Sequence, residues 1–140
     1  MSLLTEIPAP VVCCVAQDER GRYVMGRLKG GPNDGVWSFA GGKIDPGESP
    51  YQAAVRELLE ETDLYATNLR PAGYFGYDRW DNIGQHYVCM FYYCDVRGTP
   101  KLMEPDKAYE WKLVSRTRIR TMKVLPGIKN FFEERQQWHD

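Results

Sequence analysis

Residues 42–64 read GKIDPGESPYQAAVRELLEETDL, and this stretch carries the clearest local structure in the chain. Asp45-Pro46-Gly47 has the composition of a turn. Ser49 is a good N-cap for a helix, the proline after it suits the first helical position, and Gln52 completes a capping box. The stretch therefore predicts a loop followed by a helix that runs to about Thr62.

Four charged side chains gather on one side of this helix. At about 100° per residue, Arg56, Glu57, Glu60 and Glu61 fall within an arc of about 140°. The carboxylates repel one another, and they lie toward the carboxyl end of the helix, where its dipole disfavours them. We therefore expect positive charge to offset them, partly from Arg56 and partly from a hard divalent cation that prefers oxygen ligands.

The apolar residues Val55, Leu58 and Leu59 centre on the opposite side of the helix. We expect that side to pack and the carboxylates to face away from it. Taken alone, the helix also has a simpler interpretation as a solvated acidic face, which is common on surface helices. The spacing of residues upstream of the helix decides between the two interpretations.

The spacing is Gly42, five residues, Glu48, seven residues, Arg56-Glu57-Leu58, one residue, Glu60-Glu61, one residue, and Asp63-Leu64. It resembles the Nudix box, GX5EX7REUXEEXGU, in which U is a bulky aliphatic residue. Six fixed polar or glycine positions match, and a chance match in this chain is on the order of one in 10⁵. The aspartate at 63 replaces the glycine that ends the helix in a left-handed conformation. Because aspartate tolerates that conformation, we expect a small stability cost and intact chemistry.

The resemblance implies an α/β fold, namely a Nudix-type α/β/α sandwich with a mixed β-sheet and the box as a loop–helix–loop. We expect residues 1–140 to form a single Nudix hydrolase domain. The pattern of strands before and after one central helix, followed by a terminal helix, also suggests a mixed sheet with helices packed on it. Strands are predicted at 11–17, 23–28, 36–40, 74–80, 86–96 and 108–114, and a last helix at about 126–137.

The resemblance further implies Mg²⁺ or Mn²⁺ as cofactor and hydrolysis of a nucleoside diphosphate linked to another group X. By position in the box, Glu57 and Glu61 are the expected central metal ligands. Glu60 is expected to be a third ligand or to act through bound water, and the backbone carbonyl of Gly42 to be a further ligand. A cation is needed because an acidic site would otherwise repel an anionic polyphosphate.

The residues around these ligands are expected to orient the helix and to activate water. Glu48 and Arg56 are expected to form an ion pair that orients the helix. The general base varies across the family and often lies outside the box, where Glu104 and Glu110 are the candidates. Glu110 is preferred because it directly precedes Trp111, as in the MutT-like pattern. Both have a simpler interpretation as surface glutamates beside a strand.

Residues 38–44, SFAGGKI, resemble the EFPGGKI stretch of MutT-like 8-oxo-dGTP diphosphatases. This resemblance implies that Phe39 borders the base and that Lys43 lies near phosphate. Arg27 is a further candidate for phosphate binding, and Trp111 for contact with the substrate. Phe39 has a simpler interpretation as a core residue.

Residues 86–91 and 104–107 resemble stretches of small Nudix enzymes that act on nucleoside triphosphates. However, Ile128 stands about where MutT-like enzymes read the purine with an asparagine, and an apolar side chain offers no amide hydrogen bonds. We therefore expect a broad nucleoside triphosphate diphosphatase that releases a nucleoside monophosphate and pyrophosphate. Two alternatives stay open: a nucleotide-sugar or dinucleotide pyrophosphatase, and a non-catalytic nucleotide- or RNA-binding module.

Composition limits the partners of the chain. A net charge of −1 over 140 residues gives no general attraction for nucleic acid or an anionic membrane. The apolar run 11–16 is too short to span a bilayer, and we identify no signal peptide. Cys13, Cys14, Cys89 and Cys94 lack zinc-site spacing, so we expect buried thiols and a cytoplasmic location. The expected partner is a small nucleotide, bound by a monomer or homodimer.

Residues 112–123 contain five basic and no acidic side chains. The usual meaning of such a run is a solvated edge that prevents strand pairing. A nucleic-acid surface is the alternative, because five cations are enough to contact several phosphates.

Overall fold

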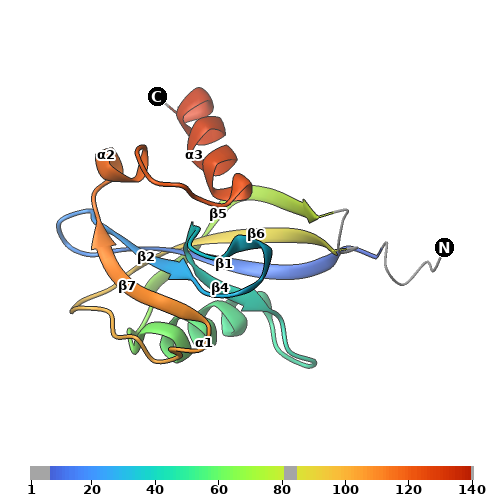
Figure 1. Cartoon of the computed structure of the whole chain (residues 1–140), viewed down its shortest axis with the longest axis horizontal. Coiled ribbons are helices and arrows are strands. Elements are labelled where there is room, and N and C mark those ends of the chain that lie inside the picture. Colours follow the sequence, from blue (N-terminus) through green and yellow to red (C-terminus); the bar gives the residue numbers. More distant parts are fainter. Residues whose placement is uncertain (1–6, 81–84, 140) are drawn as a thin grey trace.

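The structure is a computed structural model that describes residues 7–80 and 85–139, with side chains described for 7–76 and 86–134. Within these residues, seven strands form one sheet that lies between helices (Figure 1). The elements are, in chain order, β1 (Ala9–Gln17), β2 (Tyr23–Leu28), the 3-10 turn η2 (Gly31–Asn33), β3 (Trp37–Ser38), β4 (Ala40–Lys43), α1 (Pro50–Thr62), β5 (Thr67–Trp80), β6 (Gln85–Asp95), β7 (Ala108–Val114), α2 (Arg116–Ile119) and α3 (Pro126–His139).

Strand β1 is the centre of the sheet. It pairs with β6 in parallel and with β2 and β4 antiparallel. Strand β5 continues the sheet beyond β6, and β3 and β7 both pair with β2, all antiparallel. The predicted mixed sheet is therefore confirmed.

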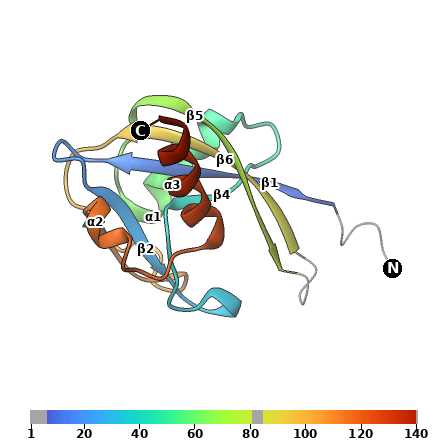
Figure 2. The same cartoon turned by 90° about the horizontal axis from the view of Figure 1, so that it is seen from above.

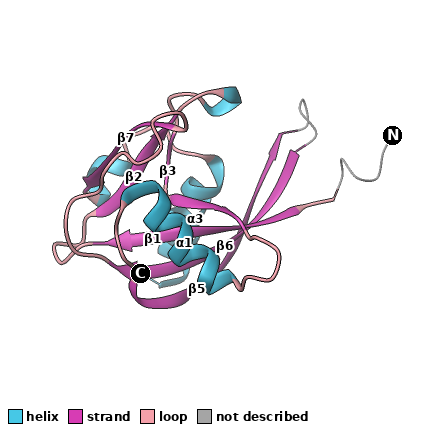
Figure 3. Cartoon of the chain, turned by 90° about the horizontal axis from the view of Figure 1, so that it is seen from below, coloured by secondary structure: helices cyan, strands magenta, loops and turns pink. Residues whose placement is uncertain are grey.

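Helix α1 covers one face of the sheet, and α2 and α3 lie over the other (Figure 1). Adjacent residues of β1 serve the two faces, because side chains alternate along a strand. Cys14 packs in the core under α1 with Leu58, whereas Val15 packs in the core under α3 with Phe131. The predicted α/β/α layering is confirmed. Figures 2 and 3 show that the β5–β6 pair and the start of β1 extend beyond the helices.

Helix α1 begins and ends as its sequence predicts. The Gln52 N–H donates to Ser49 Oγ at 3.1 Å, and the Ser49 N–H donates to Gln52 Oε1 at 2.8 Å, so the capping box is complete. After Thr62, Asp63 adopts the left-handed conformation with φ 62° and donates its N–H to the Leu59 carbonyl at 2.9 Å. Aspartate thus occupies the conformation that glycine usually provides at this position.

The predicted strand at 36–40 is instead two short strands, β3 and β4. The pair Gly41 and Gly42 lies inside β4, where each residue pairs with β1. A Cβ at Gly41 would overlap the Val12 carbonyl oxygen, so only glycine allows the two strands to lie this close. The predicted strand ended before these glycines because glycine is disfavoured in strands that lack such a constraint.

Two other elements differ from the prediction. Strand β5 begins at Thr67, well before the predicted start at 74. Its pairing with β6 has two register shifts before Phe75, but the strand continues through them. Helix α2 was not predicted; its N-cap Ser115 accepts a hydrogen bond from the Arg118 N–H at 3.2 Å. One turn of helix is too short to produce a visible periodicity.

The thiols match the prediction in three of four positions. Cys14, Cys89 and Cys94 are buried, and Cys13 is half-buried. Among the described helices, none combines the length and the apolar character needed to cross a membrane.

Candidate active site and metal centre

Two carboxylates lie within the buried face of α1. The buried residues of the helix are Ala53, Ala54, Leu58 and Thr62. At about 100° per residue they span an arc of about 180°, and Glu57 and Glu61 fall inside it. The expectation that the packed side lies opposite the carboxylates was therefore wrong. Leu58 is buried as predicted, but Val55 and Leu59 are only half-buried.

Strand β4 provides the space that these carboxylates occupy. A Cβ at Gly42 would lie 2.6 Å from Glu57 Oε1, so the carboxylate sits where a side chain would otherwise be. The Gly41 N–H donates to Glu61 Oε1 at 3.1 Å. The two glycines therefore bring the backbone of β4 against both carboxylates, which explains how an acidic pair fits beneath a helix.

Glu57 and Glu61 are hydrogen-bonded to each other. Burial raises the pKa of Glu61 to about 9, and the neighbouring Glu57 adds to that shift. Burial also raises the pKa of Glu57, although hydrogen bonds from Glu61 and Arg56 act in the opposite direction. In the absence of a cation, burial therefore favours the protonated carboxyl at Glu61.

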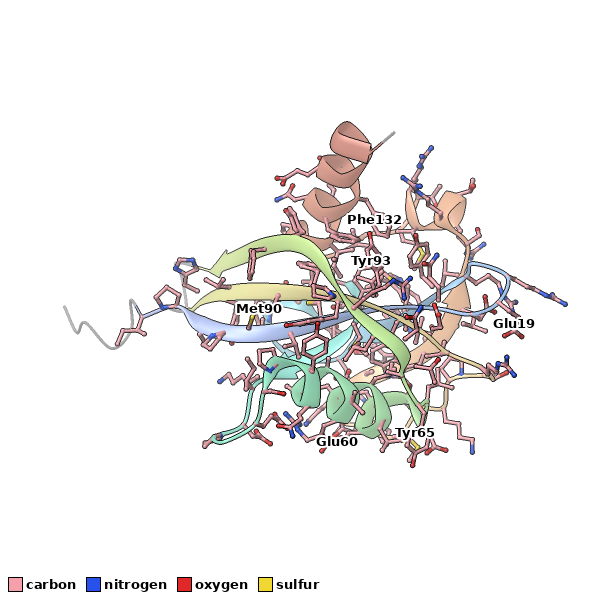
Figure 4. All side chains as sticks on the ribbon, turned by 180° about the vertical axis from the view of Figure 1, so that it is seen from behind. Glu19, Glu60, Tyr65, Met90, Tyr93 and Phe132 are labelled. Atoms are coloured by element: carbon pink, nitrogen blue, oxygen red, sulfur yellow. The ribbon has the colours of Figure 1, made fainter. Side chains whose placement is uncertain are left out.

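Arg56 ties the loop before α1 to the helix. Its Nε and Nη2 donate to the two carboxylate oxygens of Glu48 at 2.9 and 2.7 Å, and Nη2 also donates to the Lys43 carbonyl at 3.0 Å. Its Nη1 donates to Glu57 at 2.9 Å and to Glu60 at 3.2 Å. The predicted ion pair is confirmed, and the hydrogen bonds from Arg56 lower the pKa of Glu48 to about 2. Glu60 itself lies on the outer side of α1 (Figure 4).

Glu104 lies near the acidic pair. The loop that carries it runs along the end of α1, where the Met103 N–H meets the Glu61 carbonyl oxygen at 3.4 Å. The charge of Glu104 contributes to the raised pKa of Glu61. Lys107 Nζ donates to Glu104 Oε2 at 3.3 Å. Lys107 had no role in the sequence analysis, because only the fold of the loop brings it to this carboxylate.

Glu110, the preferred candidate for the base, projects from the other face of the sheet. It is next to Trp111 in β7, and Trp111 packs in the core under α1, so Glu110 points away from α1. Its carboxylate lies 3.3 Å from Arg27 Nε and 3.7 Å from Lys112 Nζ. The structure therefore brings Glu104 to the acidic pair and separates Glu110 and Arg27 from it.

The remaining candidate residues differ in exposure. Phe39 is only 3% exposed and packs against Tyr23 and Phe132 in the core. Trp111 is 8% exposed, and its indole lies across Gly26. Lys43 is exposed at the end of β4. Of these candidates, Lys43 presents the most side-chain surface to a ligand, and direct contacts by Phe39 and Trp111 stay predictions.

The chemistry of the donors fits a hard divalent cation. Two carboxylates in contact, within a carbonyl- and carboxylate-rich surrounding, offer the oxygen ligands that Mg²⁺ and Mn²⁺ prefer. Among the described residues, no three or more Asp, Glu, His or Cys side chains are already gathered around one point. Two of the nearby carboxylates are held in ion pairs, Glu60 by Arg56 and Glu104 by Lys107.

The chain is similar to known nucleotide hydrolases over parts of its length. The chain is 61% identical over 33 residues to the CTP pyrophosphohydrolase of Escherichia coli, a match that covers 24% of either protein. It is 34% identical over 79 residues to the oxidized purine nucleoside triphosphate hydrolase of Mus musculus, covering 56% of this chain and 51% of the relative. The matched segments thus span between a quarter and about half of these relatives.

A solved structure supports the fold over nearly the whole chain. The MutT protein from Methanosarcina mazei Go1 superposes with a TM-score of 0.80 at 25% identity, covering 96% of this chain and 98% of that one. The family model described as NUDIX domain matches residues 7–134. The chain, as its box predicted, belongs to the NUDIX domain family.

Proposed function

We propose that the protein is a metal-dependent pyrophosphohydrolase that converts nucleoside or deoxynucleoside triphosphates to the monophosphate and pyrophosphate. The observation that carries the proposal is the Glu57–Glu61 pair, which lies half-buried beneath α1. Burying two carboxylates in contact costs stability unless a bound cation offsets the charge. The relatives named for CTP and for oxidized purine nucleoside triphosphates support a nucleotide as the substrate.

Glu57 and Glu61 would hold the cation, with Glu60 and the Gly42 carbonyl as further ligands. A bound Mg²⁺ or Mn²⁺ supplies charge withdrawal from phosphorus and lowers the pKa of a coordinated water. Arg56 keeps Glu57 oriented through its Nη1 contact, and its contacts with Glu48 fix the guanidinium itself. Because Arg56 also holds Glu60, coordination of the cation by Glu60 would compete with that ion pair.

Glu104 is our candidate for the group that accepts the proton from the attacking water. Its side chain is 28% exposed to solvent, and its charge acts on Glu61. Lys107 donates to its carboxylate and restricts its orientation. Glu60 is a second candidate on the same side of the sheet. Glu110 is the third, although its side chain would have to act from the opposite face.

We expect the protein to discriminate only weakly between the nucleobases of its substrates. Ile128 is 2% exposed and packs with Phe131, so it presents neither amide groups nor much surface to a ligand. Lys43, exposed at the end of β4, is proposed to contact phosphate, with Arg27 as a second candidate. We therefore expect less than about tenfold discrimination between dGTP and 8-oxo-dGTP, because strong discrimination needs polar groups that are matched to the base edge.

The test is a substrate panel with Mg²⁺ and with Mn²⁺, measuring phosphate and pyrophosphate release. It contains the common nucleoside triphosphates, 8-oxo-dGTP, nucleotide sugars and dinucleoside polyphosphates. We expect pyrophosphate from triphosphates, and a rate at least ~100-fold lower in Glu61→Gln, because metal-held charge stabilisation is of that size. Glu19→Gln, at an exposed residue of the β1–β2 turn, is the matched control.

Each outcome of the panel has a defined meaning. Turnover of nucleotide sugars or dinucleotides alone would replace the triphosphate assignment with the alternative pyrophosphatase. Nucleotide binding without turnover would make the protein a binding module. An unimpaired Glu61→Gln variant would show that the reaction takes place elsewhere. The buried thiols support a reducing compartment, which we propose to be the cytoplasm.

A further inference from the structure

A second pocket lies on the face of the sheet opposite the acidic pair. It has a volume of about 540 Å³ and is formed by α2, the segment after it, and α3. Figure 1 shows these two helices on the side away from α1. Pockets of this volume accept small organic molecules, so the size alone allows a ligand as large as a mononucleotide.

The rim of this pocket is basic. Four cationic side chains and one carboxylate, that of Glu133, line it; the cations are Arg116, Arg120, Lys123 and Lys129. In the part of the chain with described side chains, only Lys129 of these four has a carboxylate partner, Glu133 at 4.0 Å. The excess is local, because the chain as a whole carries a net charge of −1. Such a concentration of like charge around a hollow favours a bound anion.

The floor of the pocket is apolar. Ile119, Met122 and Phe132 contribute to it, and Phe132 lies between α3 and the sheet (Figure 4). The Phe132 ring packs edge-on against Tyr23 with centroids 5.4 Å apart, which fixes the inner wall. A flat apolar or aromatic group therefore has a surface to pack on while the cations reach an attached phosphate.

The arginines of the basic run 112–123 differ in whether they line this pocket. Arg116, Arg118 and Arg120 are all exposed, but only Arg116 and Arg120 line the pocket. A nucleic-acid surface would use all three, because a backbone of phosphates extends past any single pocket. A pocket lined by two of the three arginines fits one small ligand better than a nucleic-acid strand.

From this geometry we infer that the α2–α3 pocket binds a mononucleotide-sized ligand in which a phosphate is attached to an aromatic base, without a divalent cation. The four cations supply the charge that the acidic site must take from a metal ion. The pocket is thus a second nucleotide site, independent of the proposed hydrolysis. Its position on the far side of the sheet keeps it separate from Glu57 and Glu61.

The experiment is an NMR titration of the ¹⁵N-labelled protein with AMP in EDTA, with ribose 5-phosphate and inorganic phosphate as separate probes. We expect shifts of the amides of residues 116–133 and not of 41–61. The double variant Arg116→Ser/Arg120→Ser should weaken AMP binding at least tenfold. Arg118→Ser, the matched control, should change it less than twofold, and Glu61→Gln should not change it.

Several results would overturn the inference. Shifts confined to 41–61, or none at all, would exclude the pocket as a nucleotide site. Inorganic phosphate binding as tightly as AMP would exclude a role for the apolar floor. An RNA oligonucleotide that binds more tightly than AMP and depends equally on Arg118 would indicate a nucleic-acid surface instead. Thermal unfolding of each variant verifies that it is folded.

Discussion

The carboxylate of Glu57 occupies the space in which a side chain at Gly42 would begin, 2.6 Å from the position of its Cβ. The glycine in the box therefore has a steric role in addition to any role of its carbonyl. The neighbouring Gly41 has a different role, because its constraint comes from the Val12 backbone and not from a side chain. The two positions can be tested separately.

Gly42→Ala should impair the site and spare the fold. The obstacle is the flexible end of Glu57, which can rotate away, so we expect a stability change of about 1 kcal/mol or less. Displacing a ligand should weaken metal binding and turnover by at least about tenfold. Calorimetric titration with Mn²⁺, steady-state rates and thermal unfolding measure the three quantities.

Gly41→Ala is the matched control. Its new methyl group would meet strand backbone that cannot move without disturbing the sheet, so we expect about 1–3 kcal/mol of lost stability. The steric explanation would be wrong if both variants lost the same stability, or if Gly42→Ala retained full metal affinity.

Metal binding should release a proton from the acidic pair. Because the pKa of Glu61 is raised to about 9, the metal-free protein carries this proton at pH 7, and the cation must displace it. The apparent affinity should rise by up to about tenfold per pH unit until the pH approaches the raised pKa. Titration calorimetry in buffers of different ionisation enthalpy counts the protons.

The same group should affect the stability of the metal-free protein. A raised carboxyl pKa gives a contribution that is present below about 4.5 and is lost as the pH rises toward about 9. Wild-type protein in EDTA should therefore lose stability across this range relative to Glu61→Gln, whose amide does not ionise. Equal pH profiles, or no proton released on metal binding, would contradict the shared proton.

Glu48 should contribute stability with the opposite sign. Its pKa is lowered to about 2 from an ordinary 4.5 by the hydrogen bonds from Arg56, so its contribution is present above about 4.5 and is lost as the pH falls toward 2. Glu48→Gln should unfold at lower urea concentration at neutral pH and should lose less on acidification. Glu19→Gln should retain the wild-type dependence of stability on pH. An equally reduced pH dependence in Glu19→Gln would show that the effect does not come from Glu48.

Asp63→Gly should stabilise the protein by about 0.5–1 kcal/mol. The left-handed conformation costs an L-residue roughly 1–2 kcal/mol, and glycine avoids this cost. Glycine also loses more conformational entropy on folding, which offsets about 0.5–1 kcal/mol of the gain in stability. The lost ion pair with Lys101 is exposed and contributes little. Asp63→Ala, which keeps the Cβ and loses the polar group, should be less stable than wild type in the same denaturant titration.

Local chemistry made α1 predictable at both ends. Ser49 and Gln52 specify the start through contacts within three residues, and Asp63 ends the helix by its own conformation. The limits of β2 and β7 also followed from local patterns. The strand β4 did not, because its two glycines are explained only by a partner strand distant in the sequence.

The direction in which the carboxylates point was not predictable from the helix alone. Helical spacing places Glu57 and Glu61 together, but only the glycines of β4 allow that side to face the sheet. The choice between Glu104 and Glu110 likewise depends on strand alternation and on the path of a loop. The sequence pattern named both residues and contained no information on which face each would occupy.

The parallel pairing of β1 with β6 also determines the order in which the molecule can assemble. Val12 and Met90 are neighbours in the sheet yet far apart in the chain, so this contact closes a long loop at a high entropic cost. The capped helix and the β1–β4 pair need much shorter loops. We therefore expect the acidic pair to be brought together early during synthesis, while the central sheet is completed only after β6 emerges, which makes folding slow relative to a helical protein of this length.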